Sequence, residues 1–305
     1  MLKKTAALIG LIIATLIWAI NGVVYYEFIA LGFSAVLILW IIRLFRFIAV
    51  WFISDFKGVK HELIKDKKEL TFVLLNGIFA FLTPLFFVFA LMYTKLSNVY
   101  FITYSAPAWV MIGAFFFLKE KINVKKIAGL LLTIAGIFMI ASPENIFSLD
   151  TGVIFSLLCA IFYAGDIITG RELKDYPLHT VSIYSNGFSF IGLSLLLPFS
   201  FKVPAFEHEL FYFAIIGLIV LGLLRGLASD LYYYALEKLD ASTASIISLV
   251  ELIFASLFAV IFFAQFPTVK EIAGYILIMA SALIIILRKS DIKQFEYLLH
   301  LKRHH

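Results

Sequence analysis

The chain has 305 residues, of which 63% are hydrophobic and 15% are charged, and its mean hydropathy is +1.01. A soluble domain is typically about 45–50% apolar and about 25% charged, and a disordered chain is more polar still, so both classes are excluded. The single cysteine, Cys159, excludes a disulfide-bonded secreted scaffold, and a polytopic membrane protein remains.

Ten segments are long and apolar enough to cross a bilayer as helices, which takes roughly 20 residues each. In chain order they are Thr5–Tyr25, Ser34–Ile53, Leu70–Ala90, Asn98–Leu118, Lys126–Ala141, Thr151–Ile168, Thr180–Leu197, Phe211–Leu231, Ser242–Phe263 and Glu271–Leu287. Their apolar runs are continuous and do not alternate every second residue, so the strands of a membrane barrel are not expected. The sequence therefore predicts an all-α membrane protein.

The positions of lysine and arginine predict the orientation of these spans. With the N-terminus inside, the cytoplasmic loops and tails hold nineteen basic residues, and the outer loops hold three, Lys95, Lys202 and Lys270. Basic residues are retained on the cytoplasmic side of membranes, so both termini are predicted to be cytoplasmic. The net charge of +5 is then a consequence of topology, and no nucleic-acid partner is predicted.

The two halves of the chain align when the sequence is shifted by 145 residues. Val124–Leu130 falls on Val269–Tyr275 with five identities in seven positions, and the offset persists from the first span to the last. Each half contains five spans, an odd number, so the second half must cross the membrane in the opposite sense. We predict a first five-helix repeat at 1–145, a second, inverted repeat at 146–290 and a cytoplasmic tail at 291–305.

Several short motifs stand out against this apolar background. They are Trp18–Asn21, Arg43, Thr94–Pro107, Phe117–Glu120, Gly129 and Ala241–Glu251. Together they resemble the drug/metabolite transporter superfamily, in particular its EamA-like branch of ten-helix transporters. The second half departs from that pattern at Leu252, where a proline is usual, and at Gln265, which stands where the first half has an acidic residue.

The resemblance implies a function and a place for the site. Members of the family commonly move amino acids, other metabolites or drugs, and many of them are exporters. Their cavity is generally built from the first four helices of each half, with the fifth and tenth spans more peripheral.

Six ionisable residues fall within the predicted spans: Arg43, Arg46, Asp166, Arg225, Asp230 and Glu251. A charge near the bilayer centre costs roughly 2.5–3.5 kcal/mol, so most of the six must face the bundle interior, pair or reach the interface. We expect Arg46 to reach the cytoplasmic interface, because it lies near that end of its span. The other five are candidate substrate-binding residues. For each, a structural hydrogen bond or an Arg–Asp pair is the alternative, and an unpaired aspartate could carry a proton.

Two helix faces combine aromatic and polar side chains. Trp18, Asn21 and Tyr25 lie three and four residues apart and share one face of the first span. Under the 145-residue shift, Trp18 falls on Tyr163 and Asn21 falls on Asp166, so the sixth span carries a similar face. We predict that the two faces form a substrate cradle near the midplane, with helix packing around a satisfied amide as the alternative.

The remaining aromatic residues and prolines have more local roles. Tyr104 is expected to reach the cavity, whereas Tyr232–Tyr234 are expected to lie at the inner interface, and most phenylalanines are expected to face lipid. Pro84 and Pro107 are predicted to kink their helices and so to shape the cavity.

These features favour a secondary transporter that works by alternating access, because inverted repeats are typical of that class. The chain has no G-x-x-x-x-G-K-[ST] motif for ATP. Aromatic residues together with both charge signs favour an amino acid as the substrate, and the family resemblance implies export as the direction. An organic cation such as a quaternary amine, held by carboxylates and cation–π contacts, is the alternative.

An intramembrane enzyme is less favoured. Tyr163-Ala-Gly-Asp166 is not the Gly-x-Gly-Asp pattern of intramembrane aspartyl proteases, and no H-E-x-x-H motif occurs. We predict no catalytic residue, metal or other cofactor. The expected partners are a small-molecule substrate and the lipid bilayer, with the proton as candidate coupling ion, and the expected location is the cell membrane.

Overall fold

A computed structural model of the protein describes residues 2–56, 58, 64, 66–143, 150–200 and 208–286. Regular structure in these ranges is entirely helical, and it supplies ten segments with the length and hydropathy of membrane spans. The predicted ten-helix architecture is therefore confirmed for the described residues. The predicted tail at 291–305 lies outside them.

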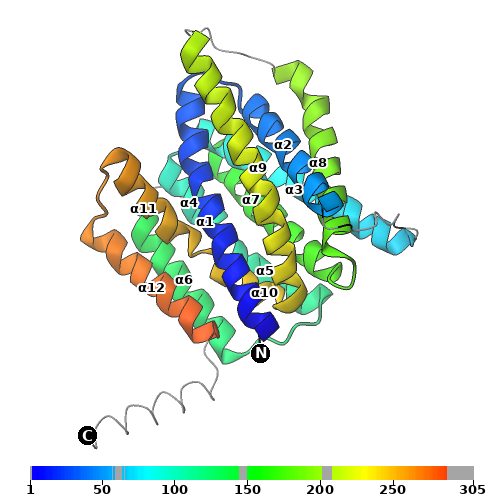
Figure 1. Ribbon diagram of the computed structural model, residues 1–305. Coiled ribbons are helices and arrows are strands. Elements are labelled where there is room, and N and C mark those ends of the chain that lie inside the picture. The colour runs from blue at the N-terminus through cyan, green and yellow to red at the C-terminus, as the bar shows by residue number, and fades with distance from the viewer. Residues whose placement is uncertain are drawn as a thin grey trace, which may run out of the picture.

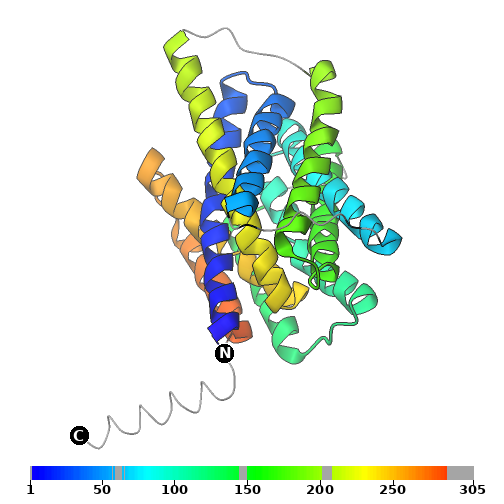
Figure 2. The same ribbon diagram turned by 45° about the vertical axis from the view of Figure 1, so that its right-hand side comes forward.

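The helices follow one another along the chain with short connections. In the first half they are α1 (Leu2–Ala30), α2 (Ala35–Phe56), α3 (Lys67–Tyr93), α4 (Leu96–Thr103), α5 (Ala106–Phe117) and α6 (Val124–Ala141). In the second half they are α7 (Thr151–Glu172), α8 (Leu178–Ser200), α9 (His208–Lys238), α10 (Ala241–Ser248), α11 (Glu251–Phe263) and α12 (Val269–Ile286). The start of α1 and the end of α12 lie at the same end of the bundle (Figures 1 and 2).

The fourth and ninth spans are each divided into two helices. Two residues separate α4 from α5, and two residues separate α10 from α11 at the positions that correspond by the 145-residue shift. Pro107, in the first turn of α5, has no N–H to continue the preceding helix. Leu252 stands at the equivalent place in α11, so the division belongs to the repeat and does not depend on proline. It also puts Ser248, the last residue of α10, and Glu251, the first residue of α11, on separate helices.

Helices α6 and α12 join the two halves at one side of the bundle (Figure 1). The Ser281 hydroxyl of α12 donates to the Gly129 carbonyl oxygen of α6 at 2.7 Å. Further along α6, a β-carbon added to Gly136 would lie 2.7 Å from the Gly274 carbonyl oxygen, so only glycine permits this approach. Early residues of α6 thus meet late residues of α12, and the two helices run antiparallel. An inverted repeat requires this relation between its fifth and tenth spans.

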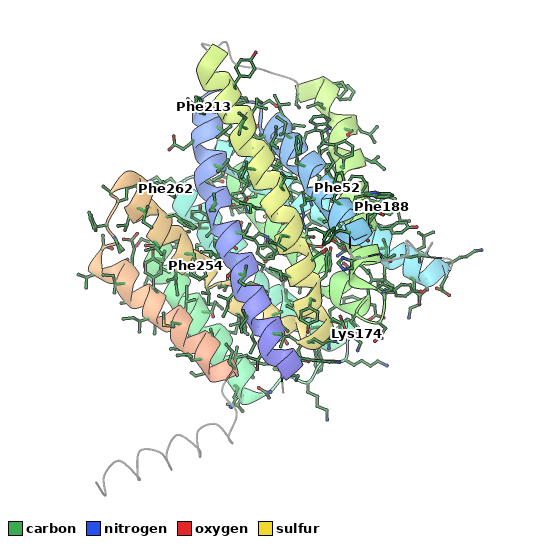
Figure 3. All side chains as sticks on the ribbon, viewed as in Figure 1. Phe52, Lys174, Phe188, Phe213, Phe254 and Phe262 are labelled. Atoms are coloured by element: carbon green, nitrogen blue, oxygen red, sulfur yellow. The ribbon has the colours of Figure 1, made fainter. Side chains whose placement is uncertain are left out.

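Few of the described phenylalanines are fully buried, but many that were predicted to face lipid, such as Phe45 and Phe81, are half-buried between helices. Phe33 is the one phenylalanine that is buried among the described residues, whereas Phe52, Phe213 and Phe262 are exposed on the outer surface (Figure 3). The core is instead rich in Ala, Leu, Ile and Val, whose smaller side chains allow the helices to approach closely.

Candidate functional site

A cavity of about 730 Å³ lies between the helices, and both halves of the chain line it. This volume is within the range of roughly 300–1,000 Å³ that is common for small-molecule sites. Nine of the ten predicted site residues line the cavity: Trp18, Asn21, Tyr25, Arg43, Tyr104, Tyr163, Asp166, Arg225 and Glu251. The two helix faces predicted to form a cradle, on α1 and on α7, therefore border the same space.

Asp230 is the predicted residue that the structure does not bring to the cavity. It is buried on α9, where its Oδ2 lies 3.0 Å from Nδ1 of His179 on α8. The Arg–Asp pair considered as the alternative role of these residues is also absent from the described contacts, and Arg225 bonds to Tyr25 instead. Asp230 lies five residues after Arg225 and on a different face of α9, which accounts for their separation.

Asp166 is held in place by a residue that the sequence analysis did not single out. Nδ2 of Asn76, a fully buried residue of α3, donates to Oδ1 of Asp166 at 2.8 Å and lies 2.9 Å from the Asp166 backbone oxygen. Oδ1 of Asn76 accepts from the Tyr233 hydroxyl of α9 at 2.7 Å. Three helices thus fix the carboxylate that faces the cavity. An asparagine in an otherwise apolar span was the available signal.

Arg43 is positioned by the proline of α3. Pro84 has no N–H, so the carbonyl oxygen of Ala80, four residues earlier, has no partner within its own helix. The Arg43 guanidinium donates to that oxygen at 2.7 Å and to Oδ1 of Asn186 on α8 at 3.1 Å. Arg43 therefore serves both as a structural anchor and as a residue of the cavity wall.

Arg46 does not reach the interface, so that expectation was wrong. Its side chain is buried, its guanidinium donates to the Ser229 hydroxyl at 2.9 Å, and it lines the cavity. Arg43 and Arg46 are three residues apart on α2 and therefore lie on one face. Packing of that face against α8 and α9 turns Arg46 inward.

Arg225 completes a group of three arginines. Its guanidinium donates to the Tyr25 hydroxyl at 2.6 Å. A small side cavity of about 10 Å³ is bordered by Arg43, Arg46 and Arg225 together with Tyr25, so the three cations adjoin one space.

Glu251 faces these arginines from the broken ninth span. It is the first residue of α11, and its Oε1 lies 3.5 Å from the hydroxyl of Tyr104 at the break in the fourth span. The two breaks therefore present one acidic and one phenolic side chain to the same cavity.

Aromatic and apolar residues close the cavity at the end where α1 begins. Trp18 contacts Tyr232 edge-to-face, with 5.0 Å between the ring centroids, and both rings are buried. Tyr232 and Tyr233 line the cavity, so their predicted place at the interface was wrong. A continuous cluster of buried apolar residues, including Leu11 and Leu236, contains Trp18 and Tyr232.

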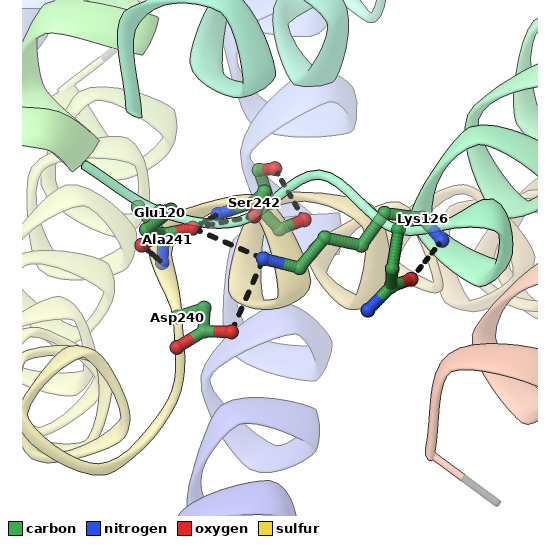
Figure 4. Close-up of polar contacts among 7 residues, drawn as sticks. Glu120, Lys126, Asp240, Ala241 and Ser242 are labelled. Atoms are coloured by element: carbon green, nitrogen blue, oxygen red, sulfur yellow. Dashed lines mark hydrogen bonds and ion pairs between the residues drawn. The ribbon is translucent and has the colours of Figure 1, made fainter. Parts of the chain in front are cut away.

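A polar cluster, which we call the inner latch, joins the halves at the same end (Figure 4). Its charged members are Glu120, which follows α5, Lys126 of α6 and Asp240 before α10. The Glu120 carboxylate accepts from the Ala241 N–H at 2.6 Å and from the Ser242 hydroxyl at 2.6 Å. It therefore caps α10 from the other half of the chain.

Lys126 completes the inner latch. Its Nζ lies 3.3 Å from the Glu120 carboxylate and 3.1 Å from that of Asp240, and its side chain is only 6% exposed. The ammonium group is thus neutralised on two sides, by a carboxylate from each half of the chain.

The opposite end of the cavity opens to the surroundings. Its lining there reaches Glu27 and Gln265, which are exposed, and also includes Glu271 and Tyr275 of α12. Residues of α6, such as Ile137, line the wall as well. The fifth and tenth spans, expected to be more peripheral, therefore contribute to the mouth of this cavity.

Comparison with known proteins shows which protein family this chain is similar to. The profile of the EamA-like transporter family matches residues 5–142 and 150–287, one match in each half of the chain. Solute carrier family 35 member G1 of Mus musculus is 25% identical over 237 residues, which are 73% of this chain and 63% of the mouse protein. This chain thus spans less than two thirds of that relative's length.

A named exporter and a solved structure are also similar to this chain. A pseudopaline exporter of Pseudomonas aeruginosa is 23% identical over 223 residues, covering 72% of this chain and 75% of that protein. A solved crystal structure matches with a TM-score of 0.76 and 16% identity, covering 92% of this chain and 96% of the other. At that identity the likeness shows the fold alone.

Proposed function

Because this chain belongs to the EamA-like transporter family, we propose that it is a secondary active transporter that moves a small metabolite by alternating access. The observation that carries the proposal is the cavity between the halves, which is lined by charged residues from within the spans. Buried charges are costly in a membrane protein and mark substrate or ion pathways.

The two ends of the bundle differ, which supports alternating access. The cavity reaches exposed residues at one end, whereas the inner latch and the Trp18–Tyr232 contact close the other end. Under the proposed orientation, with both termini cytoplasmic, the structure corresponds to an outward-open state. The inner latch connects the halves, so their relative movement would have to break it.

The substrate proposed is an amino acid or a related metabolite, and export is the proposed direction. Cations on α2 and α9, carboxylates on α7 and α11 and aromatic rings adjoin one cavity, which suits a molecule with a carboxylate, an amine and an apolar part. An organic cation is the alternative, and the three arginines beside Asp166 and Glu251 would oppose its binding. The relatives are named as transporters or exporters, which speaks against an enzyme.

We place the protein in the cell membrane, with the proton as candidate coupling ion. Asp166 and Glu251 are carboxyl groups of the cavity wall that lie within spans and away from the mouth, and we propose that one of them binds the proton. Imposing a pH gradient across proteoliposomes is expected to change the rate or the accumulation of substrate. An unchanged rate and accumulation would contradict proton coupling.

The proposed cradle is tested by exchanging Asp166 for asparagine. We expect uptake of the recognised amino acid into proteoliposomes to fall at least about tenfold, because a charge-assisted bond to the substrate ammonium group is lost. Uptake should be measured with a panel of amino acids and quaternary amines. If Asp166→Asn carries every recognised substrate at the original rate, Asp166 does not belong to the cradle.

A further inference from the structure

The three arginines of the cavity have only neutral hydrogen-bond partners. Arg43 donates to a backbone carbonyl and an amide, Arg46 to a hydroxyl, and Arg225 to a phenol. Within the described part of the chain, no ion pair of 4.0 Å or less joins any of these guanidinium groups to a carboxylate. Their partners hold the side chains in position but leave the charge uncompensated. An arginine keeps this charge at any physiological pH.

Hydrogen-bond donors also prevail among the unpartnered atoms of the cavity wall. The buried side-chain atoms there that have no partner in the protein are Trp18 Nε1, Asn21 Oδ1, Arg46 Nε, Thr103 Oγ1, Arg225 Nε and the Tyr232 hydroxyl. Three of these groups can only donate, two are hydroxyls that can donate, and one can only accept. A ligand that satisfies this set must be rich in acceptors.

The balance of charge leads to the same ligand. Away from its mouth, the cavity is bordered by three guanidinium groups and by the two carboxylates of Asp166 and Glu251, whereas Glu27 and Glu271 lie at the mouth. An ordinary amino acid, with one carboxylate and one ammonium group, would leave one arginine without an anion. A second acidic group on the substrate would remove that excess. Carboxylates match the planar fork of arginine with two parallel hydrogen bonds.

We infer that the substrate is a net anionic amino acid or a related dicarboxylate, whose acidic groups bind Arg43, Arg46 and Arg225. This inference rests on the proposed transport function and narrows it. L-Glutamate and L-glutamine provide a sharp comparison, because they have nearly the same shape and differ in one charge. Succinate tests whether the ammonium group is needed, and phosphoenolpyruvate tests a phosphate in place of a carboxylate.

The experiment measures exchange of a labelled solute by counterflow in proteoliposomes that contain the full chain. L-Glutamate, L-glutamine, succinate, phosphoenolpyruvate, L-leucine and choline are each supplied as the labelled solute and as an unlabelled competitor. We expect L-glutamate to bind at least about tenfold more tightly than L-glutamine. In Arg225→Gln this ratio should fall about tenfold, because one of the three cations, the one bonded to the Tyr25 hydroxyl, is removed. Arg225→Lys, which keeps the charge, should retain part of the preference.

Arg171→Gln is the matched control. Arg171 lies outside the cavity, and its guanidinium donates to the backbone oxygens of Leu236 and Glu237, so its loss should change stability and leave the preference for L-glutamate intact. If leucine or choline is carried and L-glutamate binds no better than L-glutamine, the anionic substrate is refuted while the transport function stands. If no solute of the panel is exchanged, both proposals fail.

A second inference starts from the correspondence between the two ends of the bundle. Under the 145-residue shift, the residues of the inner latch fall on residues near the open end of the cavity. Glu120 falls on Gln265, Lys126 on Glu271, Asp240 on Lys95 and Ser242 on Ser97. The Lys126–Asp240 ion pair thus corresponds to Glu271 and Lys95. The sign of each charge is reversed at these two positions, so their side chains still attract each other.

The backbone at the two places is alike. Lys119 and Ala264, the residues before Glu120 and Gln265, have φ angles of 54° and 53°. Helices α4 and α10 begin directly after Lys95 and Asp240, and α6 and α12 each begin after a polar N-terminal residue, Asn123 or Thr268. The same backbone framework therefore carries both sets of side chains.

We propose that Lys95 and Glu271 form an outer latch, which closes the mouth of the cavity when the inner latch opens. In the present state, Glu271 lines the mouth and its carboxylate accepts from the N–H and the hydroxyl of Thr268 at 2.6 and 2.8 Å. Closure brings the Lys95 ammonium group to that carboxylate, and Gln265 to the N-terminus of α4, as Glu120 caps α10 here.

Charge reversal tests the outer latch. We expect Lys95→Glu and Glu271→Lys each to lower the exchange rate in proteoliposomes about fivefold or more, because the inward-open state is destabilised. The double variant, Lys95→Glu with Glu271→Lys, should recover to within about twofold of the original rate, since the attraction is restored. Lys270→Glu is the matched control: it places the same charge change beside Glu271, on a residue that bonds to Ser142.

Two results would overturn the outer latch. One is a double variant that is as slow as the single ones, and the other is single variants that exchange at the original rate. Neither result bears on the proposal of an anionic substrate, which is tested by the ratio of the affinities for L-glutamate and L-glutamine.

Discussion

Replacing Glu120 with alanine is expected to open the end of the cavity that the inner latch closes and to lower transport more than tenfold. The substitution removes three hydrogen bonds to the start of α10 and one of the two carboxylates beside Lys126. The side chain of Asp240 does not cap α10, so the helix end would lose its side-chain cap. Breaking a buried ion pair costs about 3–5 kcal/mol, enough to change which state of a transporter is populated.

Two measurements report this effect: transport in proteoliposomes, and labelling of the cavity residue Cys159 by a thiol reagent added from the side of the inner latch. Glu120→Gln should give an intermediate result, because the amide oxygen can still accept from α10 but no longer neutralises Lys126. Glu172→Ala is the control, since the Glu172–Lys68 pair lies at an exposed position and surface pairs contribute about 0–1 kcal/mol. Unchanged labelling and transport in Glu120→Ala would show that the inner latch does not hold the end closed.

The second large effect is expected at Arg43. Replacement by methionine leaves the Ala80 carbonyl oxygen and the Asn186 amide oxygen without their donor, at about 1–3 kcal/mol for each buried group. It also removes one cation of the cavity. We expect a lower melting temperature together with loss of transport. Arg43→Lys should rescue this only in part, because a single ammonium group does not reproduce the planar fork.

A double-mutant cycle with Pro84 separates the two roles of Arg43. Pro84→Ala supplies an N–H that can bond to Ala80 within α3, so the loss of stability on Arg43→Met should be smaller in that background by about 1 kcal/mol. Transport should stay impaired, because the cavity still lacks the cation. Equal losses of stability in both backgrounds would contradict the pairing of Arg43 with the carbonyl that Pro84 frees.

Local pattern was enough to identify much of the candidate site. Trp18, Asn21 and Tyr25 were identified from their spacing, and Tyr163 and Asp166 from the 145-residue shift, and all five line the cavity. Helical periodicity works here because residues three and four apart share a face whatever the helix packs against. The side of the helix that meets other helices is then marked by its polar members.

The same reasoning failed for Arg46 and Tyr233. A position near the end of a span suggested the interface for both, yet Arg46 bonds to Ser229 and Tyr233 bonds to Asn76, across 183 and 157 residues of chain. Spacing along one helix carries no information on which other helix will offer a partner. Asp230 failed for the same reason, because His179 on the neighbouring helix lies next to it.

The sequence by itself determined that the protein is a membrane protein with ten spans, and that its halves correspond at a constant offset. Those properties follow from composition, from segment length against bilayer thickness and from self-similarity, none of which depends on packing. Only the tertiary structure decided that three arginines adjoin one cavity and that Glu120, Lys126 and Asp240 close one end of it. These contacts join residues whose proximity is set by the crossing of helices, and a crossing depends on the side chains of both helices at once.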